Sequence, residues 1–178
     1  MIKIFLKKFY GSSTGPQCKW QILWSWIGAF AGIALVSLLS GFVLDGTGLT
    51  LIIGSFGASA VLIYGATDSP LAQPRNLIGG HILSAIIGVT CFQLLSQQPW
   101  LASPAAVATA IAAMQLTGTV HPPGGATALI AVIGGEKIHQ LGYLYVIIPV
   151  ATGAVLMLIV ALLVNRAAPG RCYPVRKE

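Results

Sequence analysis

The sequence predicts an all-α, polytopic membrane protein made of four long helices and two short helices broken by glycine and proline. Three observations predict this class. Of the 178 residues, 56% are hydrophobic and only 8% are charged, whereas a soluble domain usually carries about 25% charged residues. The apolar residues form successive segments, and basic residues gather at both ends. A chain that cannot cover itself with polar side chains needs lipid as its solvent, so the lipid bilayer is its first expected partner.

The charges divide the chain into a basic N-terminal segment, 1–19, a transmembrane domain, 20–165, and a basic tail, 166–178. Residues 2–9 place apolar and basic side chains on different faces, which fits an interfacial helix and a frayed tail equally well. The first long apolar run, of about 23 residues, exceeds a signal-peptide core and suits an uncleaved span. Basic segments stay cytoplasmic, so both termini are expected inside, in a multi-pass protein of the cell (inner) membrane. The net charge of +6 therefore indicates topology, and nucleic acid is not an expected partner.

The apolar segments differ in length and composition. Residues 49–65 are rich in glycine, and residues 122–134 span only about 20 Å of a hydrocarbon core of about 30 Å. Rows of small residues spaced by four predict faces where helices pack closely. The predicted segments are 22–44, 49–65, 76–96, 101–116, 122–134 and 141–165, and the rows include Gly80–Ser84–Gly88 and Ala105–Thr109–Ala113.

An internal repeat is predicted from two similar stretches. GASAVL at 57–62 matches GATALI at 125–130, and the order of segments around each match is the same. The halves would be about 22–97 and 101–165, with 54–59 and 122–127 in equivalent places. Short, interrupted segments at matching positions of two halves are typical of a transporter site, although chance similarity in a low-complexity membrane sequence is the alternative. If both short segments cross the membrane the halves are inverted, and if both are re-entrant the halves are parallel.

The stretch HPPGGAT at 121–127 carries the clearest local signal. Prolines are tolerated in a first helical turn, so a helix should begin at about 122 with His121 near its N-cap. Glycines then leave backbone N–H groups uncovered at the positive end of the helix dipole, which favours an anion. Non-helical backbone at membrane depth implies a cavity, and a proline kink without a ligand is the alternative. The predicted binding residues of the two short segments are Gly54, Ser55, Phe56, Gly57, Ser59, His121, Pro122, Pro123, Gly124, Gly125 and Thr127.

A second group of polar residues opens the third long segment. Arg75 and Asn76 stand at its entrance, and His81 lies further along it. Ionisable residues inside membranes are costly and usually face a pathway, so Arg75 would attract an anion, and His81 would bind it or carry a proton. The alternatives are interfacial snorkelling of Arg75 and a helix–helix hydrogen bond from His81.

Other chemistry finds no support in the sequence. The three histidines lack metal spacing, no carboxylate pairs with a histidine, and no nucleophile or nucleotide motif occurs. The three cysteines show neither pairing nor metal spacing. We therefore expect no metal, no cofactor and no enzymatic activity.

Three stretches resemble the signatures of a known family. HPPGGATAL at 121–129, QPRNLIGGH at 73–81 and GSFGAS at 54–59 are similar to those of the HPP family of integral membrane proteins, named for its His-Pro-Pro motif. The resemblance covers about residues 20–165 and implies four membrane-spanning helices. Plant plastid and cyanobacterial members are implicated in nitrite transport, which implies a small anion as substrate here.

The favoured hypothesis is therefore a transporter or channel for a small monovalent anion, with nitrite as the named candidate. The anion would be held between two helix N-termini that face each other across a midplane cavity. Because one chain makes a thin wall, we expect a homo-oligomer. A non-transporting scaffold or partner subunit is the alternative, and it predicts no solvated cavity at 121–127. A membrane enzyme using His81 and His121 would need the two imidazoles to meet beside an open pocket.

Overall fold

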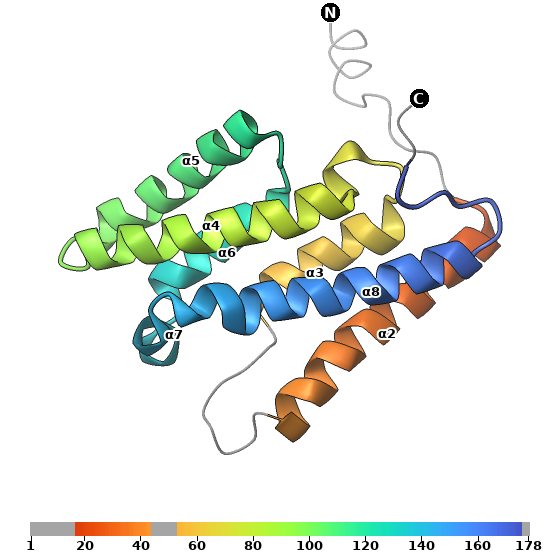
Figure 1. Cartoon of the computed structure of the whole chain (residues 1–178), viewed down its shortest axis with the longest axis horizontal. Coiled ribbons are helices and arrows are strands. Elements are labelled where there is room, and N and C mark those ends of the chain that lie inside the picture. The colour runs from red at the N-terminus through yellow and green to blue at the C-terminus, as the bar shows by residue number, and fades with distance from the viewer. Residues whose placement is uncertain (1–16, 44–52, 176–178) are drawn as a thin grey trace, which may run out of the picture.

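The computed structural model describes residues 17–43 and 53–175. All regular secondary structure in this part of the chain is helical (Figure 1). The predicted helix at 2–9 lies outside the described residues. Four helices are long and apolar enough to cross a membrane, and two apolar helices are shorter. The long elements are α2 (Lys19–Val43), α4 (Pro74–Leu95), α5 (Pro99–Thr117), and the π-helical η3 (Val146–Ala151) continuing into α8 (Thr152–Ala167). The short ones are α3 (Ser55–Ala60), continued by the π-helical η1 (Val61–Gly65), and α6 (Pro122–Ile133), with η2 (Pro70–Ala72) and α7 (Glu136–Leu141) in connections.

The first and last described helices meet on one face of the molecule, which we call the chain-end face. The Gln21 side chain at the start of α2 donates to the Pro169 carbonyl just beyond α8, at 3.0 Å. The loop 66–73 lies on the same face, because the Val175 N–H donates to the Gln73 side chain at 2.9 Å. The opposite face, which we call the far face, carries α7 and the connection from α4 to α5 (Figure 1).

α6 leads from the chain-end face to the far face, whereas α3 and η1 lead from inside the bundle to the chain-end face. α2 leads away from the chain-end face, and η1 returns to it, since the Ser25 hydroxyl of α2 donates to the Tyr64 carbonyl at 2.8 Å. α6 begins near the start of α4, where Asn76 donates to the Val120 carbonyl at 2.8 Å, and it leads to α7 on the far face. Each of these helices runs opposite to the one before it. The choice between the crossing and the re-entrant topology, like the internal repeat, stays a prediction.

Small residues bring α4 and α6 into backbone contact, as the row Gly80–Ser84–Gly88 predicts. A Cβ atom added to Gly88 would lie 2.6 Å from the Ala128 carbonyl oxygen. A Cβ atom added to Gly124 would lie 2.8 Å from both the Gly80 carbonyl oxygen and Ser84 Oγ. Since real Cβ contacts are longer, only glycine permits this approach of the two backbones.

The packed face of α5 differs from the predicted one. Its buried residues are Ala102, Ala106, Ala110 and Met114, whereas Thr109 of the predicted row is exposed. Small residues occupy several faces of this helix at the same spacing, so the spacing alone does not select the face that packs.

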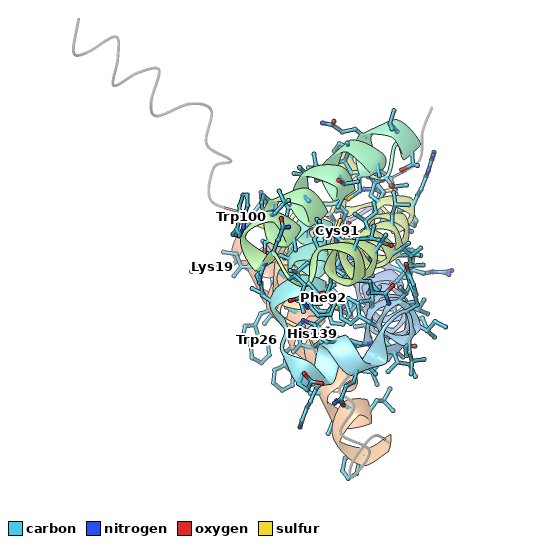
Figure 2. All side chains as sticks on the ribbon, turned by 90° about the vertical axis from the view of Figure 1, so that its left-hand side faces the viewer. Lys19, Trp26, Cys91, Phe92, Trp100 and His139 are labelled. Carbon is cyan, nitrogen blue, oxygen red and sulfur yellow. The ribbon has the colours of Figure 1, made fainter. Side chains whose placement is uncertain are left out.

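Large apolar side chains cover the outside. Trp26 is 61% exposed and Trp100 is 76% exposed, and both point away from the molecule in the end-on view of Figure 2. Phe92 and His139 lie close together in the same view, with ring centroids 3.7 Å apart. Outward-facing aromatic and aliphatic side chains suit contact with lipid.

Cysteine labelling tests the common side of the two chain ends. Cys18 and Cys172 are exposed and are the sequence neighbours of Gln17 and Arg171, which line one cavity on the chain-end face. A membrane-impermeant maleimide should therefore modify both from the same side of the membrane, and Cys91 within α4 should stay unmodified. Single-cysteine variants analysed in sealed vesicles of known orientation make the measurement. Modification of Cys18 and Cys172 from opposite sides would contradict this topology.

Candidate functional site

Five polar side chains converge inside the bundle, and we call them the buried polar network. They come from α3 (Ser55 and Ser59), α4 (His81), the residue before α6 (His121) and α6 (Thr127). Each is at most 1% exposed. Sequence reasoning named all five as binding residues, and the structure brings them together.

Ser59 stands at the centre of the network. Its Oγ lies 2.7 Å from His81 Nε2 and 2.9 Å from His121 Nε2. The two imidazole centroids are 5.0 Å apart. The hydroxyl of Ser59 therefore joins the two histidines directly, from a third helix.

The remaining contacts extend the network in two directions. His81 Nδ1 lies 2.7 Å from Thr127 Oγ1, and the Thr127 hydroxyl is within 2.9 Å of Ser55 Oγ and donates to it. On the other side, His121 Nδ1 lies 2.8 Å from the Leu71 carbonyl oxygen. Hydrogen bonds thus run without interruption from Leu71, in the loop of the chain-end face, to Ser55 at the start of α3.

The local sequence explains how His121 reaches this position. α6 begins at Pro122, as predicted, and His121 is its N-cap residue with extended backbone angles of φ −139° and ψ 103°. Its side chain makes no capping hydrogen bond to α6, because the imidazole turns toward Ser59 and Leu71 instead. The two prolines in the first turn lack N–H groups, so the helix does not need that cap.

The first turns of α3 and α6 overlap side by side. Ser55 contacts Thr127 and Ser59 contacts His121, so the order is reversed and the two helices are antiparallel. Their N-terminal ends are offset, and the hydroxyls and imidazoles fill the space between them. In α3, the Phe56 N–H is bonded to the Ile53 carbonyl at 3.0 Å, so this donor is occupied by its own chain.

The other predicted binding residues have different positions. Phe56 packs edge-on against His81 with ring centroids 5.4 Å apart, and Gly124 is the close contact with α4 described above. Arg75 is exposed and donates to the Thr117 carbonyl at the end of α5, at 2.7 Å. Asn76 bonds to the Val120 carbonyl. The Pro123 carbonyl accepts from the Thr127 hydroxyl at 3.3 Å. No hydrogen bond to a network side chain is seen for the rest of the predicted set: Gly54, Gly57, Pro122 and Gly125.

The network carries donors and no fixed negative charge. Both carboxylates of the described residues, Asp68 and Glu136, are exposed. Every buried side-chain nitrogen and oxygen of the described residues has a hydrogen-bond partner. Within this part of the chain no histidine, cysteine or acidic residues gather to hold a metal ion.

A cavity of about 480 Å³ opens on the chain-end face. Polar side chains of α2, of the loop and of the C-terminal segment line it, and none of the five network side chains does. Thr67 and Ser69 line the cavity, while Leu71 of the same loop bonds to His121. The loop 66–73 therefore separates this cavity from the buried polar network. The lining is Gln17, Gln21, Ser25, Gly65, Ala66, Thr67, Asp68, Ser69, Gly170 and Arg171.

Two partners of the network were not predicted from the sequence. One is the Leu71 carbonyl, which fixes His121, and a backbone oxygen carries no sequence signal. The other is Tyr145, fully buried, whose hydroxyl donates to the Thr127 carbonyl at 3.1 Å. Tyr145 lies beside the loop before the last long segment, where nothing in the pattern distinguishes it from Tyr143.

Fold and site together define a polytopic helical membrane protein with a polar network buried between two short helices. The family model for the HPP transmembrane region matches residues 15–174, and the chain belongs to this family. Two transmembrane proteins of Dictyostelium discoideum are similar to it. One is 44% identical over 176 residues, covering 96% of this chain and 56% of the relative. The other is 43% identical over 157 residues, covering 86% of this chain and 55% of the relative.

The chain thus spans little more than half the length of these curated relatives. No solved structure matches it significantly. The relatives support an integral, multi-pass membrane protein.

Proposed function

We propose that this protein is a membrane transporter for a small monovalent anion, with nitrite as the leading candidate. The observation that carries the proposal is the hydrogen-bonded bridge that Ser59 makes between His81 and His121, at 2.7 Å and 2.9 Å. Ionisable groups at membrane depth are costly to bury, and they usually mark an ion or substrate pathway. Short, interrupted helices are where such sites form in transporters. The nitrite assignment rests on the family resemblance.

The chemistry of the network favours an anion over a cation. Hydroxyls and imidazoles supply hydrogen-bond donors, whereas a small hard cation is usually held by carboxylate and carbonyl oxygens. Both short helices begin at the network, so the positive ends of their dipoles lie near it. An anion that entered between Ser59 and Thr127 would replace hydrogen bonds that these side chains now make to His81.

Threonine-to-valine exchange tests the site with little change of volume. In liposomes, the wild-type protein should carry nitrite faster than empty vesicles do. Thr127→Val removes the hydroxyl that joins His81 to Ser55, and nitrite flux should fall about tenfold or more, since one hydrogen bond to a charged group is worth about 1.5–3 kcal/mol. Thr90→Val is the matched control, because Thr90 lies on α4 away from the network and contacts Tyr143. Its flux should stay within about twofold of wild type.

Two results would contradict the proposal. The first is a wild-type flux of nitrite, nitrate and halides no greater than that of empty vesicles. This result would favour the hypothesis of a non-transporting scaffold. The second is equal flux in the two valine variants.

We also propose that the chain forms a homo-oligomer and has no catalytic activity of its own. The hypothesis of a membrane enzyme requires an open pocket beside the two imidazoles. His81 and His121 do approach each other, but both are fully buried, and the cavity on the chain-end face is lined by other residues. We place both termini on the cytoplasmic side of the cell (inner) membrane, on the basic residues of the two terminal segments.

A further inference from the structure

We propose that the buried polar network is a proton relay in which the Ser59 hydroxyl passes a single proton between His81 and His121, and that this proton moves with the anion. The inference rests on the proposed function and names its coupling ion. It follows from counting the donors and acceptors along the network.

The neutral network has one arrangement that satisfies both nitrogens of each imidazole. A carbonyl oxygen only accepts, so the Leu71 carbonyl fixes the proton of His121 on Nδ1, and His121 Nε2 must accept. The single Ser59 proton then points to His121 Nε2, and Ser59 Oγ must accept from the Nε2–H of His81. His81 Nδ1 is left as an acceptor, so in this neutral arrangement the Thr127 hydroxyl donates to it in place of Ser55 Oγ.

One added proton gives two further arrangements, and both keep every hydrogen bond of the two imidazoles. With the proton on His81, its Nδ1–H donates to Thr127, whose own hydroxyl turns to Ser55 at 2.9 Å. The Ser59 proton still points to His121. With the proton on His121, both of its nitrogens donate, and the Ser59 proton points to His81 Nε2 instead.

The two charged arrangements interconvert by one balanced transfer through Ser59. The N–H bond at His81 Nε2 breaks as an O–H bond forms at Ser59. The original O–H bond of Ser59 breaks as an N–H bond forms at His121 Nε2. One proton moves from one histidine to the other, and no atom needs to travel further than the hydrogen-bond distances of 2.7 and 2.9 Å.

The surroundings limit the network to one extra proton. The imidazole centroids are 5.0 Å apart, so two cationic rings would repel strongly at membrane depth. The groups packed around them offer no carboxylate. Tyr145 bonds to the Thr127 carbonyl, Arg75 points to the end of α5, and the described carboxylates, Asp68 and Glu136, are exposed. An anion is therefore the natural counter-charge for the proton, which couples the two.

Ser59→Ala removes the hydroxyl through which the proton passes. Ser84→Ala is the matched control, since Ser84 is also fully buried on α4, but its hydroxyl donates to Met114 Sδ at 3.7 Å instead of to a histidine. Both variants and wild type are placed in liposomes that contain a pH-sensitive dye, and nitrite influx and internal acidification are recorded together. The wild type and Ser84→Ala should take up about one proton per nitrite above empty vesicles. Ser59→Ala should lower that ratio about fivefold or more.

A second measurement uses the wild type alone, so it tests the relay even if Ser59→Ala fails to fold. Coupled one to one, nitrite moves with no net charge, so a potassium–valinomycin potential of about 100 mV should leave its accumulation unchanged. If nitrite crossed without a proton, the same potential would change its accumulation in the vesicles about fiftyfold. Nitrite flux that is driven by the potential and is accompanied by no proton uptake would contradict the relay, but it would not contradict the proposed transporter. Normal coupling in Ser59→Ala overturns the relay as well, and absence of any anion flux contradicts the transporter itself.

Discussion

Gly124→Ala should destabilise the protein, whereas Gly125→Ala, one residue along the same helix, should not. A Cβ atom at Gly124 would lie 2.8 Å from the Gly80 carbonyl oxygen and 3.1 Å from Met114 Sδ. At Gly125 its nearest neighbour would be a methyl carbon of Val107 at 4.0 Å. The two positions share a helix and a neighbourhood in sequence, so they isolate the effect of the packing against α4.

The expected magnitudes follow from two opposing terms. Alanine is favoured over glycine within a helix by about 1 kcal/mol, which acts at both positions. Overpacking at a contact that includes backbone costs about 1–3 kcal/mol, and occasionally more. Gly124→Ala should therefore lose up to about 2 kcal/mol, and Gly125→Ala should be neutral or gain up to about 1 kcal/mol.

Thermal unfolding of the purified variants in one detergent measures the difference. Gly124→Ala should unfold at the lower temperature, and its nitrite flux should fall because α6 carries both His121 and Thr127. Gly125→Ala should keep wild-type flux. Equal unfolding temperatures for the two variants would contradict the close approach of α4 and α6.

The helices could be predicted well because the signals that start and end them are local in the sequence. Apolar runs of sufficient length mark the four long helices, and the proline pair marks the start of α6 at Pro122. The row Gly80–Ser84–Gly88 predicted a close helix contact because larger residues surround it on α4. On α5, small residues occur on several faces, so no single row stands out, and the prediction that Ala105, Thr109 and Ala113 form the packed face was wrong.

The members of the buried polar network were also predictable, but their arrangement was not. Polar residues in apolar segments are conspicuous, so Ser59, His81, His121 and Thr127 were found from the sequence. The reversed pairing of α3 with α6 depends on long-range packing, which no local pattern encodes. The contact of His121 with the Leu71 carbonyl depends on the path of a loop.

The two arginines illustrate the same limit. Arg75 is conspicuous as an isolated charge, but its guanidinium caps the end of α5 outside the network. Arg171 sits in a basic tail and was interpreted only as a topology signal. Its side chain is in fact the most extensively bonded cation of the described residues. Composition locates a charge along the chain and leaves its partners undetermined.

Loss of Arg171 should destabilise the protein more than loss of any other basic side chain of the described residues. Its guanidinium makes five hydrogen bonds at 2.6–3.0 Å. They reach Gln21 and Ser25 of α2, the Tyr64 carbonyl at the end of η1 and the buried Asn165 of α8. One side chain therefore ties three helices together on the chain-end face, and its positive charge lies at the C-terminal ends of two of them, which the helix dipole favours.

Arg171→Ala should lower the free energy of unfolding by about 2–4 kcal/mol, because the acceptors it leaves lose their partners and water replaces only part of them. For a chain of this length that corresponds to a fall of about 5–15 °C in Tm. Arg171→Lys keeps the charge but supplies three donors from a single nitrogen in place of a planar fork. It should recover less than half of the loss.

Arg166→Ala is the matched control, because Arg166 is an exposed residue in the last turn of α8. It should change the free energy of unfolding by no more than about 0.5 kcal/mol. Should Arg171→Lys match the wild type, charge alone would hold the chain-end face together, and the geometry of the guanidinium would be irrelevant. The ranking of Arg171→Ala below Arg171→Lys, and of both below Arg166→Ala, is what five directed hydrogen bonds require.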